Sequence, residues 1–397
     1  MWAIENQPQK REWIVENWAP KKLFGDIVKV AETMLEHDYI SGEPQSVDPV
    51  FFVIGGTSCK DASRLSCHHK TRREAVKEGV GSTGRTFLAF MNIAEALKVK
   101  RIFFENVFSL KDQPCTDYDV ANDAEGRASE TTRRSNFEHV QAKCNALGML
   151  FCSVDFDART VGLPVRRRRI YMEGRAATDR TTDAMREAEV RLQASFSRTF
   201  EGVLRHVQPV DLDSILLPEY ETMVEDWLLP KMGSRVTRAA DSMMAWPDLH
   251  EPLWSAMPHR HEKRLHEEAL RENPFFLSLC ERQRDVLLLE LCRRPFSELF
   301  HSKITVGLET TATRTSGGSS DTAISCLLPR SKIWLAHRQR FLLGVESLLL
   351  QGADPEDLRA LRPKRWANSF LMDLGGNAFC VLQFTCVIIS SFATRTT

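Results

Sequence analysis

Short apolar runs alternate with amphipathic segments along the first 175 residues. The apolar runs are typical of buried strands, and the segments between them repeat apolar residues every three or four positions, as helices do. The predicted strands are Trp2–Glu5, Leu23–Asp26, Val50–Ile54, Arg101–Phe104 and Met149–Val154; the predicted helices are Gln7–Trp18, a segment ending at Glu36, one marked by Phe87, Phe90, Met91, Ala94 and Leu97, and Phe137–Leu147. This alternation predicts an α/β fold with a parallel, doubly wound sheet.

The pattern changes after residue 179. Helical patterns rich in Arg, His and Glu continue to residue 302, residues 310–322 form a linker of Gly, Ser and Thr, and residues 332–392 return to compact apolar patterning. The 397 residues are enough for two domains, or for one large domain with an insertion. We expect an α/β domain over 1–175, an inserted region over 176–335, and a segment over 336–397 that returns to the first domain.

The composition is that of an ordinary globular protein, with 43% hydrophobic and 27% charged residues. It excludes a mostly disordered chain, a collagen-like repeat and a coiled coil. The chain has 53 basic and 53 acidic residues, so its net charge is zero and does not favour binding of nucleic acid. Any contact with nucleic acid must come from local clusters of basic residues.

The cysteines and the apolar segments indicate in which cellular compartment the protein is found. Ten cysteines without a CxxC pair favour a reducing environment. The N-terminal residues have no signal-peptide pattern, and the longest apolar stretch, 378–392, is shorter than the roughly 20 residues of a membrane-spanning helix. We therefore expect an intracellular, soluble protein, located in the nucleus if the source is eukaryotic and in the cytoplasm otherwise.

Reactive side chains follow the predicted strands. Glu5, Asp26, Cys59 and Glu105 each come just after a strand, and ligands of open α/β sheets bind at the carboxyl ends of strands. A carboxylate at such a position can hold the hydroxyl groups of a ribose. We therefore expect these four side chains to line one crevice.

The segment after Cys59 is basic. Residues 60–85 contain seven Lys or Arg and three Asp or Glu, a net charge of 7 − 3 = +4. An electropositive, exposed setting favours the thiolate, which is the nucleophilic form of cysteine, and it also suits phosphate groups. The alternative is that Cys59 is a small buried residue, which is the more common role of a lone cysteine after a strand.

Eight segments occur in an order that resembles the DNA (cytosine-5) methyltransferase family across nearly the whole chain. They are Glu5 after a strand, LFGDI at 23–27, GTSC at 56–59, STGRTF at 82–87, ENV at 105–107, GLPVRRRR at 162–169, RFL at 340–342 with Glu346 and LQG at 350–352, and GNA at 376–378. Each segment is weak by itself, and the shared order makes the resemblance specific.

The resemblance implies a mechanism. Cys59 matches the cysteine that attacks carbon 6 of the cytosine ring and thereby makes carbon 5 nucleophilic. Glu105 matches the acid that holds or protonates ring nitrogen 3, a contribution of about 10²–10⁴-fold. Arg167 and Arg169 match the paired arginines that support the pyrimidine oxygen and the active-site loop. The target base must leave the duplex to reach the thiol.

The resemblance also implies the ligands. The cofactor is S-adenosylmethionine, with Glu5 on its ribose, Asp26 on its adenine, Ile27 as a further cofactor-binding residue, and Asn377 closing the site. The macromolecular partner is double-stranded DNA with a flipped cytosine. Lys60, Arg64 and Arg85 are the DNA-binding candidates, and the inserted region recognises the target. No metal is expected, because Cys59, Cys67, His68 and His69 fit no usual zinc spacing, and His259, His261 and His266 are expected on the surface.

The sequence departs from the family pattern at its start. The family begins with a strand and a Gly-rich loop that cradles the cofactor, and this chain begins at the second strand. Without that strand, Trp2–Ile4 and Val50–Ile54 would lack a neighbour. An N-terminally incomplete sequence is favoured over a degenerate relative. The usual Pro-Cys-Gln is Ser58-Cys59-Lys60 here, and Val165 stands where Gln is frequent. The alternatives are an inactive relative that binds DNA or a partner protein, and an RNA cytosine-5 methyltransferase.

Overall fold

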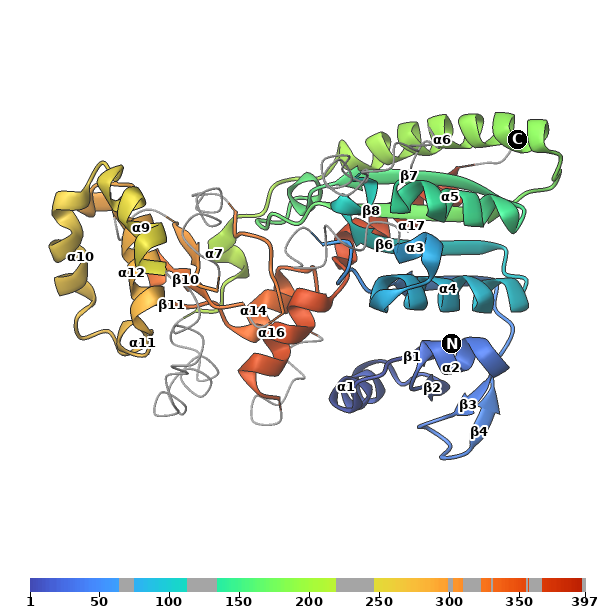
Figure 1. Cartoon of the computed structure of the whole chain (residues 1–397), viewed down its shortest axis with the longest axis horizontal. Helices are drawn as coiled ribbons and strands as arrows, with labels where there is room; N and C mark the ends of the chain where they lie inside the picture. Colours follow the sequence, from blue (N-terminus) through green and yellow to red (C-terminus); the bar gives the residue numbers. More distant parts are fainter. Residues whose placement is uncertain are drawn as a thin grey trace, which may run out of the picture. The chain divides into compact units, whose positions relative to one another are not determined.

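The computed structural model describes residues 1–63, 75–112, 134–218, 246–298, 303–309, 323–329, 331–354, 356 and 366–394 (Figure 1). These residues form two compact units. The first contains Met1–Phe156, Arg168–Arg205 and Cys386–Thr397, and the second contains Asp157–Arg167 and His206–Thr385. The division differs from the boundaries expected at 175 and 335. Arg64 and the predicted linker 310–322 lie outside the described residues.

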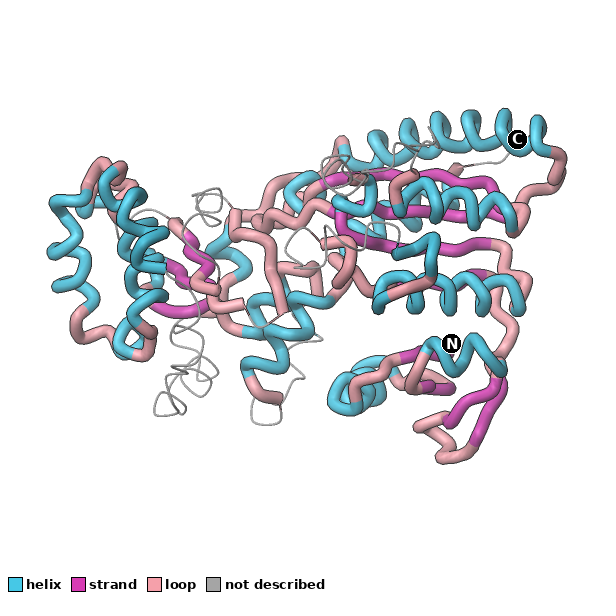
Figure 2. The backbone as a smooth tube through the Cα atoms, in the orientation of Figure 1, coloured by secondary structure: helices cyan, strands magenta, loops and turns pink. Residues whose placement is uncertain are grey.

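Four strands form the main sheet of the first unit, in the order β5-β6-β8-β7 (Figure 2). Their bounds are Phe52–Gly56, Arg101–Val107, Arg169–Ala176 and Met149–Phe156, respectively. β5 and β6 are parallel, whereas β8 is antiparallel to both of its neighbours. The α/β class is confirmed, and the expectation of an all-parallel sheet is wrong. Only the 3-10 helix η3 (Ala158–Val161) lies between β7 and β8, and parallel strands need a longer crossover, usually an α-helix.

A second, smaller sheet pairs β1 (Trp2–Ile4) with β2 (Lys22–Phe24) in parallel. Among the described residues β1 pairs only with β2, and β5 pairs only with β6, so each of the two sheets ends in an unpaired edge. The sequence predicts this arrangement, in which no strand joins Trp2–Ile4 to Val50–Ile54 in one sheet among the described residues. It also corrects the expectation that Val50–Ile54 is buried, because Phe52 and Ile54 are 39% and 42% exposed.

Helices cover both faces of the main sheet. On one face, apolar side chains of α4 and α5 share a core with Val53, Ile102 and Phe151. On the other, Phe392 of α17 lies 6.3 Å from the rings of both Phe52 and Phe103. The helices of the first unit are α1 (Pro8–Trp18), α2 (Ile27–Thr33), α3 (Ala75–Glu78), α4 (Gly81–Ala96), η1 (Phe108–Lys111), α5 (Asn136–Ala146) and α6 (Thr182–Leu204), with a hairpin of β3 (Leu35–His37) and β4 (Pro44–Ser46).

Local backbone chemistry sets several of these boundaries. Pro8 opens α1 in its first turn, as expected. Ser135 and Glu138 form a capping box at the start of α5. Helix α2 ends at Thr33 rather than at Glu36, because Met34 adopts a left-handed conformation with φ 54° and the chain continues into β3.

The second unit contains several helices and a small antiparallel sheet, β11-β10-β9. Its apolar core gathers Trp254, Leu287 and Trp334. The elements are α7 (Leu212–Ile215), α9 (Trp246–Ser255), η5 (Arg260–Glu262), α10 (Lys263–Leu270), α11 (Pro274–Leu277), α12 (Glu281–Leu291), η6 (Phe296–Glu298), β9 (Thr305–Gly307), β10 (Ile333–Leu335), η7 (Ala336–Arg338), β11 (Arg340–Phe341), α14 (Gly344–Leu349) and α16 (Asn368–Asn377).

The last helix, α17 (Val381–Ala393), follows α16 after a break at Ala378, which has extended backbone angles. By length and composition Asn368–Ala393 is long and apolar enough to cross a membrane, contrary to the estimate for 378–392. The core helix of a soluble protein passes the same test, so this is weak evidence for a membrane span. Gln383, Ser390 and Ser391 are buried polar residues on α17.

Candidate active site

The candidate site lies at the carboxyl ends of β5 and β6. These strands are parallel neighbours, with Gly56 opposite Glu105. Cys59 follows β5 by three residues, is partly exposed and forms no disulfide. The register therefore places the loop of Cys59 beside the end of β6, where Glu105 and Asn106 lie.

Hydrogen bonds from β6 and α4 hold the loop that carries Cys59. The Asn106 amide donates to the hydroxyl and the carbonyl oxygen of Thr57, at 3.0 and 3.3 Å. The Ser58 N–H donates to the Thr86 hydroxyl of α4 at 3.1 Å. The chain then forms a turn that begins at Cys59, because the N–H groups of Ala62 and Ser63 donate to the Cys59 carbonyl oxygen. The thiol is thus presented by a loop fixed at both of its ends.

A reciprocal pair of hydrogen bonds closes the other end of this loop. The Asp61 N–H donates to the Thr83 hydroxyl at 3.0 Å, and the Thr83 N–H donates to the Asp61 carboxylate at 2.9 Å. Thr83 lies in the first turn of α4, where backbone N–H groups lack helical partners. Two DNA-binding candidates, Lys60 and Arg85, are exposed on either side of this contact.

Glu105 is buried in contact with Arg169. The Arg169 Nε lies 2.9 Å from Glu105 Oε1, and both side chains are little exposed. Glu105 Oε1 is nevertheless a buried atom that accepts no well-aligned hydrogen bond from the described residues. The ion pair therefore fixes the carboxyl group and leaves its hydrogen-bonding capacity incompletely used.

The other arginines of the 166–169 run lie elsewhere. β8 begins only at Arg169, so Arg166, Arg167 and Arg168 precede the strand. Arg168 pairs with Asp155 at 2.7 Å and lies over the ring of Phe108. Arg167 belongs to the second unit, where it is buried and donates to the carbonyl oxygens of Gly376 and Ala378. In the described structure Arg167 is an anchor for the end of α16.

The cofactor-binding candidates of the first unit lie at the carboxyl ends of β1 and β2. Glu5 follows β1, and its carboxylate accepts from the Gln7 N–H at 2.8 Å. Asp26 caps α2 through a hydrogen bond from the Val28 N–H at 2.9 Å. Ile27 packs partly buried against the core, beside α4. Both carboxylates are partly exposed, and each keeps an oxygen beyond the one that bonds the local backbone.

Asn377 ends α16 in the second unit, and its side chain donates to the Asp373 carbonyl oxygen at 2.8 Å. Sequence reasoning gave no role to Asn106, Thr83 or Thr86, although all three lie in the quoted motifs. Their position beside the first turn of a helix or next to a candidate acid was the available signal.

Comparisons with known proteins add the following. No protein-family model matches the chain, and no curated protein matches it. Among solved structures it is similar to the S. pombe Dnmt2 methyltransferase, at 11% identity and a TM-score of 0.47, covering 98% of this chain and 88% of that one. It is also similar to the Entamoeba histolytica methyltransferase EhMeth, at 10% identity and a TM-score of 0.44, covering 98% and 87%. TM-scores below 0.5 mark only a loose similarity, so the assignment of function depends on the residues of this chain.

Proposed function

We propose that this protein is an S-adenosylmethionine-dependent methyltransferase that modifies carbon 5 of cytosine in DNA. The observation that carries the proposal is Glu105, a buried carboxyl group held by Arg169 with hydrogen-bonding capacity to spare, on the strand next to the loop of Cys59. A thiol and a carboxyl group at adjacent strand ends are the two groups that addition to a pyrimidine ring requires.

The reaction divides between these two side chains. The Cys59 sulfur forms a bond to ring carbon 6, and the ring electrons move toward carbon 5 while Glu105 holds a proton at ring nitrogen 3. S-adenosylmethionine held by Glu5 and Asp26 would supply the electrophilic methyl group to carbon 5 and would leave as the neutral thioether S-adenosylhomocysteine. Loss of the carbon 5 proton to a base expels the Cys59 thiolate, restores the ring double bond and frees 5-methylcytosine. Arg169 acts as a positioning residue, because it touches Glu105.

Residues at the ends of β1 and β2 suit the nucleoside part of the cofactor. Glu5 and Asp26 are partly exposed carboxylates at neighbouring strand ends, and each has an oxygen that does not bond the local backbone. A ribose hydroxyl and an adenine amino group are donors that such oxygens accept. We assign Glu5 to the ribose and Asp26 with Ile27 to the adenine, and Asn377 is a further cofactor-binding candidate by family resemblance.

Exposed cations at the loop of Cys59 suit a phosphate backbone. Lys60 directly follows Cys59, and Arg85 lies just after the first turn of α4, whose N-terminal residues hold the loop. Contacts of this kind position a duplex without reading its sequence. Arg64 belongs to the same proposed group by its place in the sequence.

Covalent trapping tests the proposal. A duplex oligonucleotide with 5-fluorocytosine in place of cytosine should form a stable adduct with the full chain in the presence of S-adenosylmethionine, because fluorine at carbon 5 cannot leave as a proton. Cys59→Ser should abolish the adduct, and Cys326→Ser, a control at another partly exposed cysteine, should retain it. An adduct that survives in Cys59→Ser would show that another group is the nucleophile.

Calorimetry and a second substrate distinguish the alternatives. An adduct with structured RNA and none with duplex DNA would replace the DNA assignment by RNA. Measurable S-adenosylmethionine binding without an adduct on either nucleic acid would separate cofactor binding from catalysis. DNA binding without cofactor binding would identify an inactive relative.

A further inference from the structure

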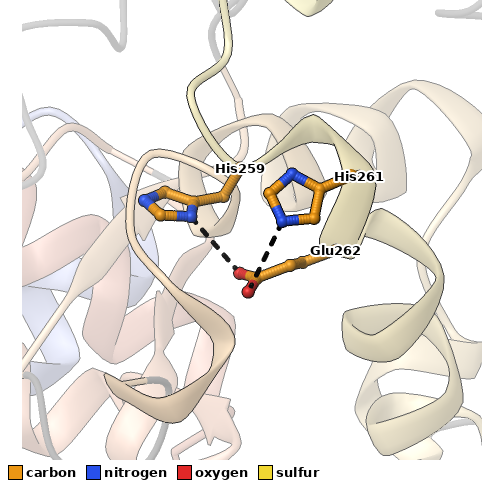
Figure 3. Close-up of side chains that lie close together, drawn as sticks. All are labelled: His259, His261 and Glu262. Atoms are coloured by element: carbon orange, nitrogen blue, oxygen red, sulfur yellow. Dashed lines mark ion pairs between the residues drawn. The ribbon is translucent and has the colours of Figure 1, made fainter.

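The second unit carries a compact set of metal-ligand side chains that the methyltransferase proposal does not use. His259, His261 and Glu262 lie within and just before the 3-10 helix η5, and their donor atoms all lie within 4.8 Å of one another (Figure 3). His259 Nδ1 is 3.5 Å from Glu262 Oε2, and His261 Nε2 is 3.9 Å from Glu262 Oε1. Both rings point toward the same carboxylate.

These separations suit a shared ion better than direct hydrogen bonds. A nitrogen–oxygen hydrogen bond spans about 2.7–3.2 Å, and both contacts are longer. Zinc binds histidine nitrogen and carboxylate oxygen at about 2.0–2.2 Å, so two ligands of a tetrahedral site lie about 3.3–3.6 Å apart. The 3.5 Å contact falls in this range, and the 3.9 Å contact reaches it with a small rotation of an exposed ring.

The backbone fixes two of the three ligands. The Phe296 N–H donates to Glu262 Oε2 at 2.7 Å, which orients the carboxylate in the way that supporting hydrogen bonds orient metal ligands. The His259 N–H donates to the Cys292 carbonyl oxygen at 3.2 Å, at the end of α12. The cluster therefore joins η5 to the segments that follow α12, and an ion there would tie these parts together.

Two cations near the cluster in the sequence contact other groups. The Lys263 ammonium lies over the ring of Trp254 and 3.7 Å from Asp285. Arg294 lies 3.9 Å from Glu298. Lys263, the residue that follows Glu262, is thus held by Asp285 and Trp254.

A third histidine, which is buried, follows the cluster in the sequence. His266 is one helical turn after Glu262 and 1% exposed, and neither of its ring nitrogens has a hydrogen-bond partner among the described residues. Burial is the main reason that its pKa is lowered; Glu262 opposes this change and His259 reinforces it. The expectation that His266 is on the surface is therefore wrong. A neutral imidazole is the form that binds metals.

We propose that His259, His261 and Glu262 form a zinc-binding site in the second unit, with a fourth position open to water. Three nitrogen and oxygen ligands with one open position are a set that zinc accepts. The proposal does not depend on the methyltransferase assignment.

The test is zinc binding by the full chain after its metals have been removed. In competition with a chromophoric chelator, wild-type protein should bind one equivalent of zinc. The affinity for this zinc should be at least ten-fold lower in both His261→Ala and Glu262→Gln. His206→Ala, at another exposed histidine of the same unit, should bind as wild type does. His261 is 75% exposed, so its removal leaves the fold intact, which circular dichroism checks.

Ten cysteines offer competing ligands, so the bound ion must also be characterised. X-ray absorption of the zinc-loaded protein should show only nitrogen and oxygen neighbours at about 2.0–2.2 Å, without sulfur at about 2.3 Å. A sulfur shell, no stoichiometric zinc, or equal affinity in wild type and both variants would overturn the site.

Discussion

Two buried glutamate–arginine pairs, one in each unit, differ in how fully the carboxylate is bonded. In the second unit, Glu346 accepts from both terminal nitrogens of Arg340, at 2.7 and 2.9 Å, and also from the N–H groups of Leu217 and Leu343. In the first unit, Glu105 Oε1 lies 2.9 Å from Arg169 Nε, and this oxygen accepts no aligned hydrogen bond from the described residues.

The difference supports the proposal that Glu346 belongs to a structural pair and Glu105 to a reactive one. Glu346 is completely buried, and each of its oxygens faces two donors, so it has no room for a ligand and its charge is fully compensated. Glu105 lies at a strand end beside the loop of Cys59, and it retains a capacity that a substrate could use. Burial of an ion pair is therefore common to both, and the number of donors distinguishes their roles.

The largest expected effect is that of a substitution at Glu105 on the rate of adduct formation. Glu105→Gln should lower the rate of adduct formation with 5-fluorocytosine DNA by about 10²–10⁴-fold, because an amide cannot exchange a proton with ring nitrogen 3. Gel analysis of the adduct against time gives the rate. An unchanged rate would remove Glu105 from the mechanism, and circular dichroism must show that the variant is folded.

The same substitution at the other pair should act on stability. Glu346→Gln places an NH₂ group against an arginine N–H and a backbone N–H, whichever way the amide is turned, and it leaves Arg340 buried without its counter-charge. We expect a loss of about 3–5 kcal/mol in the free energy of unfolding. Urea denaturation measures it.

Glu105→Gln is the matched control in the denaturation experiment. Its amide can turn its oxygen toward Arg169 and its NH₂ away, so its loss should be clearly smaller. If both variants lose the same stability, the distinction between the two carboxylates fails.

Local patterns predicted many of the elements and the candidate chemistry. The periodicity of 87–97 and the apolar run of 149–154 correspond to α4 and β7. Such elements are predictable because the spacing of apolar residues along the chain reflects which face of a helix or strand is buried. The direction of β8 was not predictable in this way, since it follows from the connection to β7 and not from the strand's own residues.

The state of the site depends on neighbours that the sequence does not show. Glu105 and Glu346 both lie in the family-like motifs, and nothing in those motifs indicates that Glu346 accepts from four donors while Glu105 Oε1 accepts no aligned hydrogen bond from the described residues. Arg167 and Arg169 are two residues apart, yet they belong to different units. His266 is buried among residues of a charged helix, where the pattern indicates a surface position.

A smaller effect is expected at Asp26, which caps α2 and is also the residue proposed to bind the adenine of the cofactor. Asp26→Ala should lose about 1 kcal/mol of stability with the N-cap of α2 and should also weaken S-adenosylmethionine binding. Asp26→Ser keeps a capping oxygen and removes the carboxylate. Calorimetry should therefore show weak cofactor binding in both variants, with normal stability only in the serine variant. Wild-type affinity in Asp26→Ser would limit this residue to its structural role.

The smallest effect is expected at Asp213, a half-exposed carboxylate in the second unit. Burial raises its pKa, but hydrogen bonds from Lys303 and His337 outweigh burial and bring the pKa to about 2. Because the folded-state pKa lies below that of the unfolded chain, the stabilisation is complete above about pH 4 and disappears as the pH falls through about 2. Asp213→Asn should be less stable than wild type at pH 5 and should approach it near pH 2. Thermal unfolding over this range measures the difference, and a gap between the two proteins that stays constant with pH would show that the charge of Asp213 does not contribute.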